Sequence, residues 1–219
     1  MKKEISITED KIFELYSDYI LTHGEQPKSV YQFAKENKFE EQKFYTFFTS
    51  FDQVEKHILV KLFSKSIELA EDVNNAEGMT SKEKLLNVYY IFFENLTMNR
   101  SLVLMILGKH KLPLSKNLLS LKKIHQEYIK TLDFSSWEIL EKAKEDIKNT
   151  HEQIRENVLW LHLVSAIEFW KNDFSPDFEK TDIFIEKTID TGFELMDNEP
   201  LRKVFDLGKF LWKEKFNRS

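Results

Sequence analysis

Apolar residues recur along this chain every three or four positions, which is the spacing of one helical face, and they seldom alternate with polar residues as in a strand. Only five glycines and four prolines interrupt the pattern. It therefore predicts an all-α fold. The first four predicted helices run from Ile7 or a Thr8 cap to Gly24, from a Ser29 cap to residue 37, over 40–48, and from a Ser50 cap to residue 74.

Beyond a polar stretch around Gly78 the predicted helices become more apolar. Ser81 is predicted to cap a helix that ends at residue 98, and Pro113 to stop the next. The helices at 85–98, 102–108 and 157–170 are apolar on nearly every face, so we expect them to form an interior. The remaining predicted helices are amphipathic and lie at 115–132, 136–148, 178–197 and, beginning with Pro200, at the end of the chain.

The three short helices at the N-terminus form a helix-turn-helix pattern, because only a few residues join the second and third. We therefore predict two domains. Residues 1–50 are expected to form a three-helix helix-turn-helix domain, and residues 51–219 a larger helical domain.

The segment "HGEQPKSVYQFAKENKFEEQKFYTFFTSFDQV" resembles the DNA-binding domain of the TetR (tetracycline-repressor) family of bacterial transcriptional regulators. The similarity covers about residues 8–60. The matching positions are Gly24 at the end of the first helix, Ser29, the apolar face of Val30, Phe33 and Ala34, the turn residue Phe39, and the aromatic run "FYTFFTS" at 44–50. The resemblance implies a DNA-binding homodimer in which residues 51–219 form the ligand-binding and dimerisation domain. Binding of a small ligand by this domain would change the affinity for the operator.

The same resemblance implies that Tyr45 places its hydroxyl on a DNA phosphate, while Ser29 and neighbouring amides hold another. Among the residues expected to point outward, Gln42 could pair with adenine, and Lys43 with guanine or a phosphate. The predicted DNA-binding residues are Lys28, Ser29, Gln42, Lys43, Tyr45 and Thr46.

Several positions depart from the family pattern and remove positive charge from this surface. Lys38 replaces a turn glycine, Phe51 stands where a lysine is usual, and Glu40 with Glu41 opens the recognition helix. Residues 1–60 hold eight lysines and eleven carboxylates, a net charge of −3. Because neutralised phosphates provide much of the affinity for DNA, weak binding is expected. The alternative is a three-helix scaffold that no longer binds DNA.

Composition narrows the class of protein further. The net charge is −5, which gives no chain-wide footprint for nucleic acid, although residues 200–219 carry six cations and two anions. The chain has no cysteine, which excludes disulfides and thiolate chemistry. Neither a signal-peptide pattern nor an apolar run long enough to cross a membrane is present, so a cytoplasmic location is expected.

The apolar helices of the C-terminal part are rich in large aromatic residues. Such a cluster can be a plain hydrophobic core or the wall of a cavity for a large apolar molecule. For the cavity, the expected ligand-binding residues are Tyr90, Phe93, Arg100, Trp160 and His162.

Two surfaces for partners are expected. Helices at about 152–172 and 178–197 should form the dimer interface, unless they pack only within one chain. The cationic amphipathic helix at 200–219 could lie on a membrane or pack on its own domain. A lipid-binding family of ubiquinone biosynthesis looks architecturally similar, so the alternative function is a lipid- or isoprenoid-binding protein that touches membranes and has lost DNA binding.

Enzyme chemistry finds little support in the sequence. The segment "HEQIR" at 151 begins like a zinc-protease motif, but Arg155 stands where the second ligand belongs. His151 and His162 could share a helix face, yet two ligands without a third are weak grounds for a metal. We expect neither an enzyme nor a cofactor nor a metal site.

Overall fold

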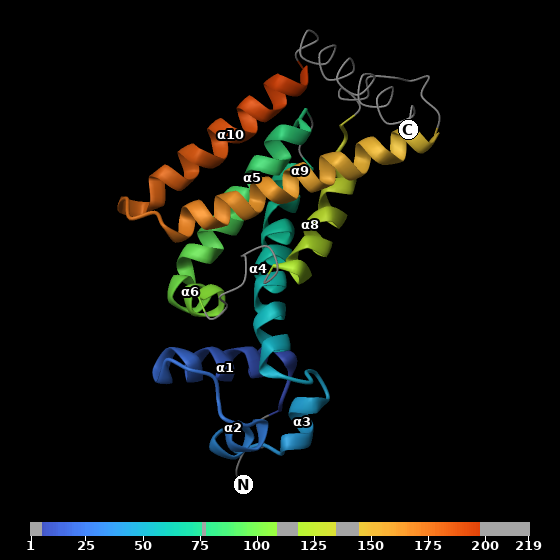
Figure 1. The fold of residues 1–219 in the computed structure, drawn as a ribbon. Helices are drawn as coiled ribbons and strands as arrows, with labels where there is room; N and C mark the ends of the chain where they lie inside the picture. The colour runs from blue at the N-terminus through green and yellow to red at the C-terminus, as the bar shows by residue number, and fades with distance from the viewer. Residues whose placement is uncertain (1–5, 76–77, 109–117, 135–144, 198–219) are drawn as a thin grey trace, which may run out of the picture. The chain divides into compact units, whose positions relative to one another are not determined.

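The computed structural model describes residues 6–75, 78–108, 118–134 and 145–197 (Figure 1). The described residues contain helices and no strand, which confirms the all-α prediction. The helices are α1 (Glu9–His23), α2 (Val30–Glu36), α3 (Glu41–Tyr45), α4 (Phe51–Asn74), α5 (Ser81–Met98), α6 (Arg100–Gly108), α8 (Leu119–Thr131), α9 (Glu145–Lys171) and α10 (Glu179–Asp197), with a short 3-10 turn, η2 (Pro176–Phe178), before the last.

Helix contacts divide the chain into two compact units. Unit 1 comprises Met1–Leu69 and Ile91–Glu127, and unit 2 comprises Ala70–Tyr90 and Tyr128–Ser219. The unit boundaries fall inside α4, α5 and α8. The functional division into residues 1–50 and 51–219 stays a prediction.

Polar side chains cap the starts of the N-terminal helices, and a glycine ends the first of them, as predicted. The Thr8 Oγ1 accepts a hydrogen bond from Lys11 N at 3.2 Å, and Ser29 Oγ accepts one from Gln32 N at 3.1 Å. Gly24 ends α1 with a φ of +75°, a left-handed conformation that costs glycine little. Ser50 Oγ accepts from Gln53 N at 3.3 Å at the start of α4. These caps confirm the predicted ends of α1 and the predicted starts of α2 and α4.

The turn between α2 and α3 contains Lys38 in the left-handed region, with a φ of 60°. This is the position at which the TetR pattern has glycine. A side chain with a Cβ costs about 1–2 kcal/mol there, which explains the usual glycine. The turn thus keeps its conformation with a lysine in place of the expected residue.

Phe33 is the centre of the hydrophobic core formed by α1, α2, α3 and the first turn of α4. It is fully buried, and its ring lies 5.4–6.4 Å from five other rings. Those rings belong to Tyr16, Tyr19, Phe39, Phe44 and Phe51. Phe48 of the "FYTFFTS" run also packs on α1, since its ring is 5.3 Å from that of Phe13. Helices α2 and α3 are therefore held on α1 by aromatic contacts.

A buried carboxylate joins α4 to α1 within unit 1. Glu55 is 2% exposed, and its Oε1 accepts hydrogen bonds from the Tyr16 hydroxyl at 2.6 Å and from Gln26 Nε2 at 3.0 Å. Burial, reinforced by the Glu55 carboxylate, raises the pKa of Tyr16, so the phenol stays protonated and remains a donor. Polar contacts therefore supplement the aromatic core where α4 begins.

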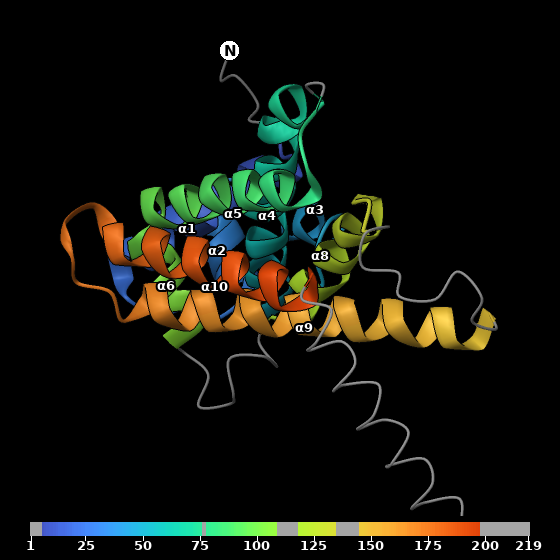
Figure 2. The ribbon, with the colours of Figure 1, turned by 90° about the horizontal axis from the view of Figure 1, so that it is seen from above.

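In unit 2, α9 and α10 lie side by side and are joined by a tightly bonded turn (Figures 1 and 2). Asp173 is buried in this turn, and its carboxylate accepts from Ser175 N and Oγ and from Thr181 N and Oγ1, at 2.7–2.9 Å. Burial opposes its ionisation, but these four donors outweigh burial and lower the pKa of Asp173. The turn that leads into α10 is therefore fixed by one side chain.

Helix α9 corrects two expectations. The segment between 148 and 157 is helical, so α9 is continuous from residue 145 to residue 171. Its polar sequence "NTHEQIRE" lacks apolar periodicity but contains nothing that breaks a helix. The expectation that 157–170 would be enclosed is also wrong in part, because Val158 and Leu161 are 57% and 59% exposed.

Two smaller boundaries also differ from the predictions. Thr80 caps α5 in place of Ser81, because Thr80 Oγ1 accepts from Glu83 N while Glu83 Oε2 accepts from Thr80 N, a reciprocal capping box. Helix α3 ends at Tyr45, earlier than the predicted residue 48. The backbone oxygen of Phe44 accepts hydrogen bonds from both Phe47 N and Phe48 N, which forms a tight turn there.

Some expectations fall on residues that the structure does not describe. These are the stop at Pro113, most of the helix predicted at 136–148, and the amphipathic helix from Pro200. Among the described helices, none has both the length and the apolar character needed to span a membrane.

Candidate DNA-binding surface and ligand site

All six residues predicted to bind DNA are exposed on α2, α3 and their flanks. Ser29 caps α2 with its hydroxyl oxygen, which leaves the hydroxyl hydrogen available for a phosphate, and Lys28 precedes it. Both lie at the N-terminus of α2, where free amides favour anions. The structure thus places this pair as the resemblance implies, and DNA binding by it stays a prediction.

The other four residues lie on α3 or directly after it. Gln42 and Lys43 are exposed, and among the described residues neither side chain has a hydrogen-bond or ion-pair partner. Thr46 Oγ1 donates to Gln42 O at 3.3 Å. The amide of Gln42 and the ammonium of Lys43 are therefore free to contact a base or a phosphate.

Tyr45 differs from its neighbours because an anion already holds its hydroxyl. The side chain is 51% exposed, and its hydroxyl donates to Glu41 Oε1 at 3.2 Å across one helical turn. Partial desolvation and the Glu41 carboxylate together raise the pKa of Tyr45, so the phenol keeps its proton. Tyr45 is thus a competent donor whose present acceptor is a carboxylate.

Two features of this surface were not found from the sequence, namely the packing of Phe51 in the core and the exposure of Tyr31. Phe51 is buried and stacks on Tyr16 at 5.2 Å with ring planes 12° apart, so this position serves packing and supplies no phosphate contact. Tyr31 on α2 is 59% exposed, and the ammonium of Lys35 lies 5.8 Å from its ring centre. The sequence contains a signal for this exposure, because the spacing of Tyr31 does not place it on the apolar face of Val30, Phe33 and Ala34.

The five predicted ligand-binding residues are divided between the two units. Tyr90, Trp160 and His162 belong to unit 2, whereas Phe93 and Arg100 belong to unit 1. Phe93 and Trp160 are buried, and the other three are partly exposed. Each unit therefore has to be considered by itself as a place for a ligand.

His162 on α9 is the most unusual polar group among them. Its ring lies between those of Tyr89 and Phe184, at 5.8 and 6.4 Å, with nearly parallel planes. Its Nε2 is 2.7 Å from Thr188 Oγ1, whose own hydrogen goes to Phe184 O at 2.6 Å. Nε2 must therefore be the protonated nitrogen, because the threonine oxygen can only accept from it.

The other ring nitrogen of His162 is left as an acceptor. Nδ1 is buried and has no hydrogen-bond partner among the described residues. Burial also lowers the pKa of His162 to about 4, so the ring is neutral near pH 7. A buried acceptor without a donor is uncommon in proteins and suits a hydroxyl or N–H group of a bound molecule.

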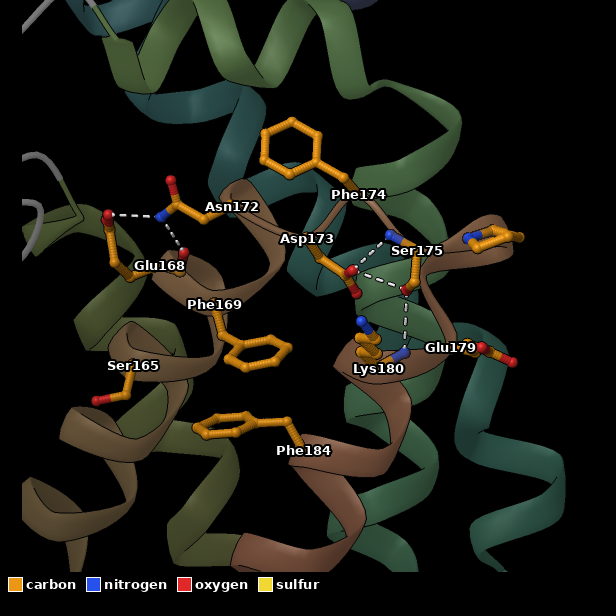
Figure 3. A pocket seen from close by; sticks show the side chains of 11 residues that line it. Ser165, Glu168, Phe169, Asn172, Asp173, Phe174, Ser175, Glu179, Lys180 and Phe184 are labelled. Atoms are coloured by element: carbon orange, nitrogen blue, oxygen red, sulfur yellow. Dashed lines mark hydrogen bonds between the residues drawn. The ribbon is translucent and has the colours of Figure 1, made fainter.

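A groove of about 890 Å³ lies where α9 turns into α10 (Figure 3). The rings of Phe169 and Phe184 stack at 4.5 Å in its wall, and Phe174 stands on the turn with 91% of its surface exposed. Glu168, Asn172 and Lys180 are among its polar lining residues. None of the five predicted ligand-binding residues lines this groove.

An exposed stripe runs along α9 and continues to the groove. Ile154, Val158 and Leu161 form its apolar part, at intervals of four and three residues, and Ile183 is a further exposed apolar residue on α10. Ser165, Glu168 and Asn172 extend the stripe and also line the groove. The stripe is unusual because exposed apolar residues here are contiguous along one helix face.

Comparison with known proteins bears on the C-terminal part of the chain. A family model described as a tetracyclin repressor-like C-terminal domain matches residues 84–211. Comparisons with curated proteins and with solved structures each found no match. The family match covers more than half of the chain and lies outside the N-terminal segment that carried the resemblance. The chain therefore belongs to the TetR-like (tetracycline-repressor-like) family.

Proposed function

We propose that this protein is a transcriptional regulator that binds DNA as a homodimer and whose affinity for its operator is modulated by a hydrophobic ligand. The observation that supports DNA binding best is the exposed set of polar side chains on α3, which the aromatic core around Phe33 holds in place. Ligand binding in the C-terminal domain would shift the dimer between two states of different DNA affinity.

The first test is the binding of DNA from upstream of its own gene, at low and at moderate salt. We expect specific binding that Lys43→Ala weakens several-fold. If Lys43 contacts a phosphate, the plot of log binding constant against log salt concentration should also become less steep. Its slope should change by about two for a dimer, one for each lysine lost. Lys65→Ala is the control, because this exposed lysine on α4 pairs with Glu68 and is not part of the proposed surface. No specific binding at low salt would exclude the regulator function.

For the ligand we propose a large apolar molecule with one hydrogen-bond donor, which would meet Nδ1 of His162 in unit 2. The neutral state of His162 supports this proposal, since a protonated ring would have no acceptor to offer. Tyr90 and Trp160 belong to the same unit as His162 and are proposed to contact the apolar part of the ligand.

The neutral state of His162 has a measurable consequence for stability. The folded pKa of about 4 is below the ordinary value of 6.5, so the unfolded chain takes up the proton first as the pH falls. This stability is therefore fully present above pH 6.5 and is lost between pH 6.5 and 4, by about 2 kcal/mol after allowance for residual solvent exposure. Chemical denaturation at several pH values in this range gives the free energy of unfolding as a function of pH. This free energy should fall more steeply with decreasing pH in the wild type than in His162→Phe. Parallel curves for the two proteins would argue against a neutral buried imidazole.

The homodimer is proposed to form through α9 and α10. The support is the exposed apolar stripe of Ile154, Val158 and Leu161, because a stripe of this kind on one helix face is typical of an interface between chains. A two-fold dimer would bring the same face of each copy together, so each apolar residue of the stripe would be buried in both copies.

A further inference from the structure

The hydroxyl of Tyr45 is the one donor in the proposed DNA-binding set that a carboxylate occupies in the described structure. Ser29 uses its oxygen and keeps its hydrogen free, and Lys43 has no ion-pair partner among the described residues. Thr46 donates to a neutral backbone oxygen. Tyr45 alone must therefore leave an anionic acceptor before it can donate to a phosphate.

We infer that Glu41 lowers the DNA affinity of this protein by competing with a backbone phosphate for the hydroxyl of Tyr45. The inference rests on the proposed DNA-binding function and identifies which acidic residue of α3 weakens it. Carboxylate and phosphate oxygens are both anionic acceptors, so the hydroxyl can serve only one of them at a time. The remaining carboxylate would then face the phosphate at short range, and the two negative charges would repel each other.

Geometry distinguishes Glu41 from the neighbouring Glu40. Glu41 lies four residues before Tyr45, which puts both side chains on one face of α3. Glu40 precedes the helix, is exposed and makes no capping hydrogen bond with its side chain. The two residues carry the same charge and are adjacent in the chain. They differ in whether they hold Tyr45.

No salt bridge to Glu41 offsets its charge within the described part of the chain. Lys35 on α2 lies over the ring of Tyr31. Residues 1–60 carry a net charge of −3, so the surroundings do not neutralise the carboxylate. Removing this one charge should therefore have a clear effect on binding to a polyanion.

The experiment compares Glu41→Gln with Glu40→Gln in the full-length protein, each with and without Tyr45→Phe. The probe is DNA from upstream of the gene, with an unrelated duplex of the same length, at about 0.1 M salt, where the screening length is ~10 Å. We expect Glu41→Gln to tighten binding about fivefold or more, and Glu40→Gln about twofold, because only the first replaces the anionic acceptor of the Tyr45 hydroxyl with a weaker, neutral amide oxygen. In the Tyr45→Phe background the gain from Glu41→Gln should fall to that of Glu40→Gln.

Equal gains from the two glutamine variants, unchanged by Tyr45→Phe, would overturn the inference and leave the proposed regulator function standing. The effect would then be one of general charge. If neither the wild type nor Glu41→Gln binds the upstream DNA specifically at low salt, both the inference and the proposed function are overturned.

Discussion

Replacing Phe33 with alanine should destabilise the N-terminal helices by about 3–5 kcal/mol, the usual cost of deleting a buried phenylalanine ring. Phe33 is fully buried, and five aromatic rings surround it. The loss combines the hydrophobic transfer free energy of the ring, the edge-to-face contacts and the cavity that remains. The free energy of unfolding of a domain is only about 5–15 kcal/mol in total. In the variant, the helix-turn-helix should therefore unfold under milder conditions than the rest of the chain.

Tyr31→Ala is the matched control for this variant. It removes an aromatic ring from the same short helix, but the ring is mostly exposed and lies beside Lys35. Hydrogen exchange of the amides in α2 and α3 would report the local opening, and urea denaturation followed by circular dichroism the total change. A Phe33→Ala protein as stable as Tyr31→Ala would show that this cluster does not hold the helices together.

The second large effect is expected from Leu161→Asp, which should convert the proposed dimer into a monomer at micromolar concentration. Leu161 lies within the exposed stripe of α9, with Val158 on the preceding turn. In a two-fold dimer the substitution would place two carboxylates in an apolar contact, and each unpaired buried charge costs several kcal/mol. A penalty of this size weakens association by about a hundredfold or more.

Leu69→Asp provides the comparison, because Leu69 on α4 is also about half exposed and belongs to the other unit. Sedimentation equilibrium of the wild type and both variants would give the dissociation constants. We expect Leu69→Asp to remain a dimer. Dissociation by both variants to the same extent, or a monomeric wild type, would contradict an interface on α9 and α10.

The elements that sequence reasoning found well are those specified by local chemistry. Thr8 and Ser29 bond amides only three residues away, and Gly24 adopts a conformation that few other residues tolerate. Such features depend on neighbours in the chain, so they can be recognised without knowledge of the fold. The burial of Phe33 was also foreseeable, because Val30, Phe33 and Ala34 lie at helical spacing on one apolar face.

The expectations that failed depended on which distant segments meet. Apolar Val158 and Leu161 looked like interior residues, but periodicity cannot show that no other part of the described chain covers them. In the same way, the hydrogen bond that fixes which ring nitrogen of His162 carries the proton is accepted by Thr188, twenty-six residues later. The groove between α9 and α10 needed the turn at Asp173, whose bonding to Ser175 and Thr181 has no obvious motif.

The Glu55 carboxylate has a mechanical consequence for the proposed coupling between a ligand and DNA. It lies on the second turn of α4 and binds Tyr16 of α1 together with Gln26 of the loop that follows α1. Rotation of α4 against α1 at this level would strand a buried negative charge, which is costly. The first turns of α4 should therefore move with α1 as one rigid body, and any hinge in α4 should lie on the C-terminal side of Glu55.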